Sequence, residues 1–121
     1  ALPPAQAAAT REALRIAQAA DHLRERLRAH IEHLRQGARS RGLALVPSDT
    51  PIQPLVIGSD MHALAMAAAL ERQGYWVVAI RPPTVPEGSA RLRITLSAAH
   101  GPAQVEGLLD ALARARDAVA A

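Results

Sequence analysis

The sequence predicts an α+β domain: a small, mostly antiparallel sheet with helices on one face, preceded by a long N-terminal helical segment. After that segment the predicted elements follow the order strand, strand, helix, strand, strand, helix. Residues 91–97 alternate between apolar and polar side chains, which is typical of a half-buried strand. Its apolar positions are Leu92, Ile94 and Leu96, and its polar positions are Arg91, Arg93 and Thr95.

Length and composition bound the class of protein. The 121 residues suit one domain with a thin core of Leu, Ile, Val and Ala, because Phe is absent and Trp and Tyr occur once each. The absence of cysteine excludes disulfides, thiolate metal sites and cysteine nucleophiles. No apolar run has membrane-spanning length and the start lacks a secretory pattern, so we expect a cytoplasmic protein.

The first 42 residues are predicted to be helical and to form a connection that precedes the α+β domain of residues 43–121. Pro4 and the alanines after it favour a helix start, and Asp21 is a candidate N-cap for a second helix or for a continuation after a kink. One apolar stripe follows, and Gly37 and Gly42 bracket the predicted helix exit. The stripe comprises Leu23, Leu27, His30, Ile31 and Leu34.

The predicted domain begins with a short strand over 43–46 and a buried strand over 54–58. Ser59 or Asp60 caps a helix whose apolar residues are Leu64, Met66, Ala67 and Leu70, and Gly74 ends it. A strand over 75–80, with Trp76 in the core, leads into the next connection. A last helix over 103–118 carries Val105, Leu108, Leu109 and Leu112 inward.

The connection between the last two strands contains three prolines and a glycine, which exclude a helix and stiffen the backbone. A rigid loop costs less entropy to hold in place, so it suits a binding site. Arg81 enters this loop and Arg93 lies on the polar face of the strand that follows. Two guanidiniums at one rigid loop indicate a place for two carboxylates, or for one carboxylate and a phosphate.

Several blocks of this sequence resemble the C-terminal domain of the alpha-oxoamine synthases, a family of fold-type I pyridoxal-phosphate enzymes. They are Ile-Gln-Pro-Leu-Val-Ile-Gly at 52–58, Gly-Tyr-Trp-Val at 74–77, Ile-Arg-Pro-Pro-Thr-Val-Pro at 80–86 and Ala-Arg-Leu-Arg-Ile-Thr-Leu-Ser-Ala-Ala-His at 90–100. The resemblance implies a homodimer with active sites at the subunit interface. It also implies that residues 1–42 connect to a large domain outside this sequence.

The resemblance assigns roles to three residues. Arg93, the second arginine of Ala-Arg-Leu-Arg, would bind the carboxylate of the amino-acid substrate. The Arg-Pro-Pro form of the loop is that of members using a pimeloyl thioester, so Arg81 would face the far carboxylate of the acyl chain. Thr84 would contact substrate or cofactor. The implied reaction is a decarboxylative condensation of L-alanine with the pimeloyl thioester, carried on coenzyme A or acyl carrier protein.

The cofactor pyridoxal 5'-phosphate (PLP) is held in such enzymes as a Schiff base on a lysine. All fourteen basic residues of this chain are arginine, so none can form that bond. We therefore expect no catalytic residue here, no PLP held by the chain alone, and no activity of the chain by itself.

Without the resemblance, plainer readings stay open. Arg93 could be a solvated or ion-paired strand residue, Arg81 could pair with Glu87, and Thr84 could stabilise a turn. His100 is expected to be structural, and His30 and His33 lack a third metal ligand nearby in sequence. We expect no nucleic-acid partner, because acidic residues interrupt the arginines and a base-stacking sheet needs exposed aromatics. Within the family the alternatives are glycine C-acetyltransferase and 5-aminolevulinate synthase. Outside it, the alternative is a stand-alone ligand-binding module.

Overall fold

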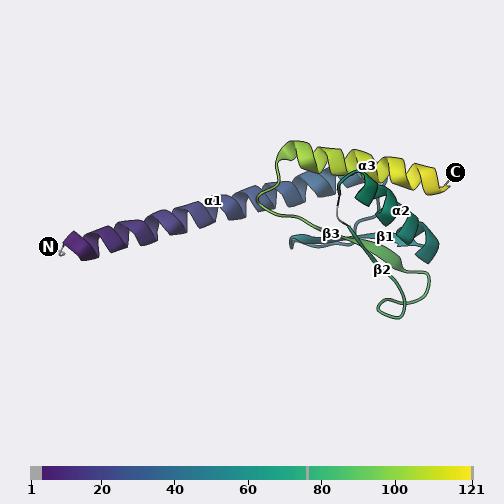
Figure 1. Ribbon diagram of the computed structural model, residues 1–121, viewed down its shortest axis with the longest axis horizontal. Coiled ribbons are helices and arrows are strands. Elements are labelled where there is room, and N and C mark those ends of the chain that lie inside the picture. The colour runs from purple at the N-terminus through teal and green to yellow at the C-terminus, as the bar shows by residue number, and fades with distance from the viewer. Residues whose placement is uncertain (1–3, 76, 121) are drawn as a thin grey trace.

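Helix α1 (Pro4–Ser40) opens the part of the chain that the computed structural model describes, residues 4–75 and 77–120. Its 37 residues form one continuous helix, about 55 Å long at 1.5 Å per residue. The predicted break at Asp21 is wrong: Asp21 lies inside the helix and pairs with Arg24 one turn later. Alanine-rich sequence on both sides lets the helix run through. Its N-terminal half extends away from the rest of the molecule (Figure 1).

The last turns of α1 belong to the core. His30, Ile31, Leu34 and Ala38 are buried, whereas Leu23 is 49% exposed, so the sheet and helices cover only the C-terminal part of the predicted stripe. The helix ends at Ser40, between Gly37 and Gly42, as predicted. Gly37 itself lies inside α1, where an added Cβ would stand 2.2 Å from Cδ1 of Leu109.

The sheet has three strands in the order β1-β3-β2, and both pairings are antiparallel. The strands are β1 (Ile52–Gly58), β2 (Val78–Ile80) and β3 (Ala90–Thr95). The predicted strand over 43–46 is reduced to a single bridge between Leu45 and Leu55. The ladder stops there because Pro54 has no N–H to donate and Pro47 ends the partner segment.

Strand β2 is shorter than predicted, since it starts at Val78 instead of residue 75. The Tyr75 hydroxyl lies so close to α3 (Pro102–Ala120) that a Cβ on Gly107 would stand 2.4 Å from it. Tyr75 therefore packs against a helix instead of extending the ladder. The prediction that Trp76 lies in the core falls outside the described residues.

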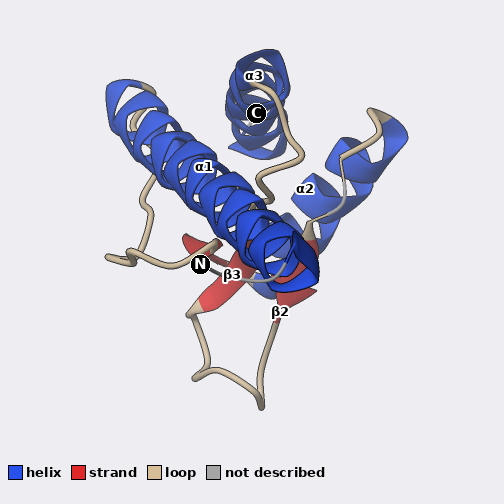
Figure 2. Ribbon diagram, turned by 90° about the vertical axis from the view of Figure 1, so that its left-hand side faces the viewer, coloured by secondary structure: helices blue, strands red, loops and turns tan. Residues whose placement is uncertain are grey.

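The helices α1, α2 (Asp60–Arg72) and α3 all lie on one side of the sheet (Figure 2), as predicted. The inward positions of α3 are confirmed: Val105, Leu108, Leu109 and Leu112 are buried. In α2, Ala63, Met66 and Leu70 are buried, and Leu64 is 44% exposed.

Strand β1 is not fully buried as predicted. Gln53 and Leu55 point into the core, whereas Ile52 and Val56 are 46% and 38% exposed. The reason is that the helices cover one face only, so the other face of the sheet is uncovered. Among the described residues, no helix combines the length and apolarity that crossing a membrane requires.

Candidate functional site

The uncovered face of the sheet carries the polar positions of β3. Along β3, Ala90, Leu92 and Ile94 are buried against the helices, and Arg93 and Thr95 are exposed. Arg91 is half-buried. The strand's alternation therefore places two arginines and Thr95 on the central strand, on a face that also includes the apolar Val56 and Val78.

Arg93 lies at the centre of this face. Its register partners are Pro54 on β1 and Val78 on β2, so apolar residues flank it on both sides. Its guanidinium makes no hydrogen bond or ion pair with any described residue. A planar cation with five free donors on an apolar surface matches a carboxylate, which accepts two parallel hydrogen bonds from it.

Arg81 directly follows β2, whose last residue, Ile80, pairs with Arg91. Its exposed guanidinium also has no partner among the described residues, so the alternative pairing with Glu87 is not formed. Arg81 lies three residues beyond Val78, the neighbour of Arg93. At about 3.3 Å per residue, the two arginines start about 10 Å apart along the strand direction. That spacing suits two separate anionic groups.

The loop from residue 81 to residue 89, here called the proline loop, brings Thr84 near Arg81. The Thr84 N–H donates to the Arg81 carbonyl at 3.1 Å, and the peptide between Pro82 and Pro83 is cis. The Thr84 hydroxyl is exposed and has no described partner. The structure thus gathers two of the predicted residues in one turn and places the third, Arg93, on the strand that leaves the loop.

His100 has a structural place. Its Nδ1 accepts from the Ser97 N–H at 3.1 Å, and its carbonyl accepts from Nε2 of the buried His30 at 2.6 Å. His30 therefore ties α1 to the turn between β3 and α3. The described residues contain no group of three His, Cys, Asp or Glu side chains that could hold a metal ion.

Sequence reasoning missed a polar seam between α1 and α3. His33 Nε2 lies 2.7 Å from Glu106, and Arg41 donates to Glu106 at 2.6 Å and to Asp110 at 2.9 Å. Hydrogen bonds from His33 and then Arg41 hold the pKa of Glu106 below its ordinary value. The partners are 65 to 73 residues apart in sequence, so no local spacing signals them.

A second polar network joins α1 to β1. The amide of Gln53, which is completely buried, donates to the carbonyls of Ser48 and Thr50 and accepts from Arg35 at 2.8 Å. Arg35 also donates to the Val46 carbonyl. The network fixes the start of β1, the strand that borders Arg93, to the core part of α1.

A groove of about 390 Å³ lies between Tyr75, the segment from Ile94 to Leu96 and the first turns of α3. Neither Arg81, Thr84 nor Arg93 lines it. We therefore assign the candidate site to the uncovered sheet face and the proline loop.

Comparison with known proteins gives one family and a consistent set of relatives. The family model for aminotransferase class I and II matches residues 1–112. The chain is 58% identical over 119 residues to 8-amino-7-oxononanoate synthase of Xanthomonas oryzae pv. oryzae, and 55% identical over 120 residues to that of Xylella fastidiosa. These matches cover 98% and 99% of this chain, but it spans only 30% of the length of either relative.

Solved structures agree. A structure of SPT with a PLP internal aldimine superposes with a TM-score of 0.79 at 32% identity, over 84% of this chain and 26% of that one. Sphingomonas wittichii serine palmitoyltransferase gives a TM-score of 0.68 at 31% identity, over 81% and 24%. The 8-amino-7-oxononanoate synthase of Francisella tularensis gives 0.68 at 23% identity, over 78% and 27%, and so shows the shared fold.

Proposed function

Because this chain belongs to the aminotransferase class I and II family, we propose that it is the substrate-binding C-terminal part of an 8-amino-7-oxononanoate synthase. The whole enzyme would condense L-alanine with a pimeloyl thioester, with loss of carbon dioxide, in biotin biosynthesis. One observation carries the proposal: Arg93, in the Ala-Arg-Leu-Arg segment, presents an unpaired guanidinium between Pro54 and Val78 on the uncovered face of the sheet.

Arg93 would bind the carboxylate of alanine. Two parallel hydrogen bonds from one guanidinium fix both the position and the plane of a carboxylate. Such a clamp orients the bond that breaks when carbon dioxide is released. Orientation of this kind supplies a large part of an enzyme's rate enhancement. Lysine at this position would keep the positive charge but lose the planar pair of N–H donors.

Arg81 and Thr84 would bind the acyl substrate. Arg81 starts about 10 Å from Arg93 along the strand direction, so the two arginines can hold the carboxylates at opposite ends of the combined substrates. Thr84 would offer its free hydroxyl from the same turn. A site with both arginines would favour an acyl chain that ends in a carboxylate over an acetyl group, which has no carboxylate for Arg81.

The family's cofactor is not anchored here. A Schiff base with PLP needs a lysine, and the chain contains none. The covalent anchor would therefore come from a part of the enzyme outside this sequence, and these residues supply substrate binding only. We further propose that the whole enzyme is a homodimer and that the 121-residue chain alone is inactive.

The test is a chimera in which this chain replaces the matching segment of the Xanthomonas oryzae enzyme. Thiol release would be followed with pimeloyl-, acetyl-, succinyl- and palmitoyl-coenzyme A, each with alanine, glycine or serine. We expect release with pimeloyl-coenzyme A and alanine, at a rate close to that of the parent enzyme. Preference for another pair would keep the family and refute the substrates. Serine with palmitoyl-coenzyme A would favour the activity that the name serine palmitoyltransferase describes. No release from any pair, with the parent active, would refute the proposal.

A further inference from the structure

We propose that Arg91 is a positioning residue: it holds the proline loop, and through Arg81 and Thr84 it sets the affinity for the acyl substrate without contacting either substrate. The inference rests on the proposed function and deepens it. It assigns different jobs to the two arginines of the Ala-Arg-Leu-Arg segment, which the alternation of β3 places on the same face.

Arg91 and Arg93 differ in their contacts. The Arg91 Nε–H donates to the Ser89 carbonyl at 3.2 Å, so its side chain turns back toward the end of the proline loop. Arg91 is half-buried between its register partners Val56 and Ile80. Arg93 is exposed and has no described partner. The first arginine is thus committed to the protein's own backbone, and the second is free for a ligand.

Ser89, whose carbonyl accepts the bond from Arg91, is the last residue of the proline loop. The Ser89 N–H and hydroxyl both donate to the Pro86 carbonyl, at 3.1 and 2.5 Å. Within the described loop, the bonds made by Ser89 and Arg91 are the only hydrogen bonds that involve a side chain. They therefore form a chain from β3 through Ser89 to Pro86, two residues after Thr84.

The end of β1 lies beside the C-terminal end of the proline loop. The register between β1 and β3 shifts between Val56 and Gly58, and Gly58 has a φ of +98°, which other residues rarely adopt. The carbonyl of Gly88 lies 3.6 Å from the place where a Cβ of Gly58 would be. The loop thus passes beside the bulged end of β1, and Arg91 bonds the next residue of the loop, Ser89.

Because of these contacts, loss of the Arg91 bond should affect the binding of the two substrates differently. Arg93 is held by a strand paired on both sides, so loss of the Arg91 bond leaves its backbone in place. Arg81 and Thr84 lie in the loop itself, so the same loss lets them move. A misplacement of about 1 Å can reduce a rate by roughly a hundredfold. We expect the effect of Arg91 to fall on the acyl substrate alone.

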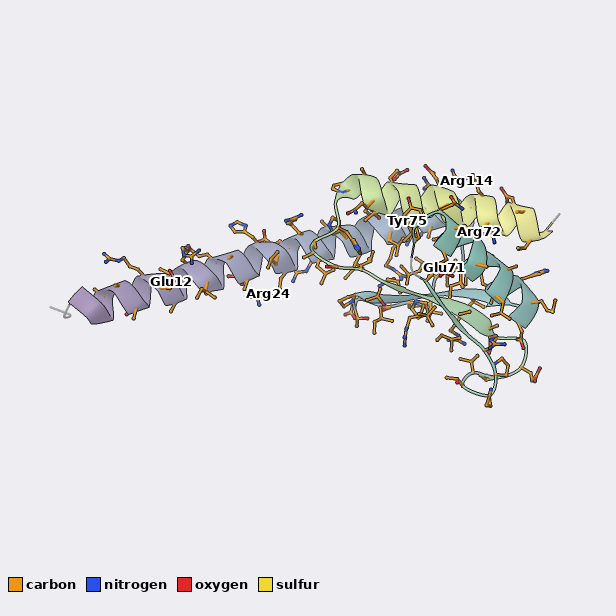
Figure 3. All side chains as sticks on the ribbon, in the orientation of Figure 1. Glu12, Arg24, Glu71, Arg72, Tyr75 and Arg114 are labelled. Carbon is orange, nitrogen blue, oxygen red and sulfur yellow. The ribbon has the colours of Figure 1, made fainter. Side chains whose placement is uncertain are left out.

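The experiment uses the chimera and its Arg91→Gln variant. We expect the KM for pimeloyl-coenzyme A to rise about tenfold, with an unchanged KM for alanine. Titration of the PLP absorbance with alanine alone gives a second readout, which should also be unchanged. Arg72→Gln is the matched control: Arg72 is an exposed arginine without a described partner, at the end of α2 remote from Gly58 (Figure 3). It should leave all these values unchanged.

A double-mutant cycle separates positioning from direct contact. The readout is the preference for pimeloyl- over heptanoyl-coenzyme A, which differ in the far carboxylate. If Arg91 acts through Arg81, Arg81→Gln with Arg91→Gln should lose no more preference than Arg81→Gln alone. If the double variant loses preference by the product of the two single losses, the proposal is overturned, because Arg91 would then contact the carboxylate itself. A weakened alanine titration in Arg91→Gln would overturn it as well.

A second variant covers the case in which Arg91→Gln does not fold. Ser89→Ala removes only the hydroxyl bond to Pro86, and we expect a smaller rise in the same KM, with alanine binding unaffected. An unchanged acyl KM in a folded Ser89→Ala protein would overturn the proposal. If the unmodified chimera shows no preference for pimeloyl-coenzyme A, the proposed substrate itself fails and this inference fails with it, which is seen before any variant is made.

Discussion

Replacing Gly37 with alanine tests how tightly α1 is joined to the rest of the domain. Gly37 lies within α1, and its backbone faces α3. An added Cβ would stand 2.2 Å from Cδ1 and 3.2 Å from Cδ2 of Leu109. Leu109 is completely buried, so it cannot swing into solvent to make room.

Two terms of opposite sign decide the result. In an open helix position, alanine in place of glycine stabilises by about 1 kcal/mol. Overpacking a well-filled core costs about 1–3 kcal/mol. A contact near 2 Å against a fully buried side chain lies at the upper end of that cost. The net prediction is a loss of about 1–2 kcal/mol in the free energy of unfolding.

Urea denaturation followed by far-UV circular dichroism measures this change. Gly107→Ala is the matched control, because Gly107 also lies inside a helix and its Cβ would meet the half-buried Tyr75, with the hydroxyl at 2.4 Å and Cζ at 3.6 Å. That ring can shift outward, so we expect little change or a small gain in stability. A Gly37→Ala protein as stable as the unmodified chain would refute the close packing of α1 on α3.

Two further predictions concern the polar networks. Gln53→Leu should destabilise by about 2 kcal/mol in the same assay, because it removes the buried amide that bonds Arg35 and the carbonyls of Ser48 and Thr50. The exposed Gln36→Leu should change stability by less than about 1 kcal/mol. Glu106 has a lowered pKa when folded, so its stabilising contribution is complete above its ordinary value of 4.5 and is lost as the pH falls through the lowered value. The free energy of unfolding should therefore fall less steeply in acid for Glu106→Gln than for the unmodified chain. The same pH profile for both proteins would contradict the bonds from His33 and Arg41 to Glu106.

The sheet and its chemistry could be predicted from sequence because they depend on local patterns. Alternation over residues 91–97 placed Leu92 and Ile94 in the core and Arg93 on the outer face, as the structure shows. The prolines placed Arg81 and Thr84 in a turn between strands. The same blocks predicted a pyridoxal-phosphate enzyme family, and the match to the aminotransferase class I and II model agrees with that prediction.

Long-range contacts could not be predicted in this way. The strand expected over 43–46 failed because the pairing depends on Pro54, which is not a neighbour in sequence. Gly37 and Gly42 bracket the helix end as predicted, but the packing of Gly37 against Leu109 on α3 has no signal in the local sequence. The α1–α3 seam and the Arg35–Gln53 bond likewise join residues with no common motif.

The first 42 residues were expected to form a helical connection to a large domain outside this sequence. In the structure, His30, Leu34 and Ala38 of α1 are buried in the core. The N-terminal part of α1 projects outward, and Glu12 and Arg24 lie along this projecting part (Figure 3). Stability measurements on a chain that begins after Ser40 would locate the boundary.

The measurement that tests the central claim most directly is alanine binding to the chimera and to its Arg93→Lys and Arg93→Gln variants, followed by the change in PLP absorbance. If Arg93 clamps the carboxylate of alanine, both variants should bind alanine at least tenfold more weakly, since lysine keeps the charge but lacks the planar fork. Arg72→Gln should bind alanine normally. Unchanged alanine affinity in folded, PLP-loaded Arg93→Gln would contradict the account, because the free guanidinium on the uncovered face would then have no part in binding the amino acid.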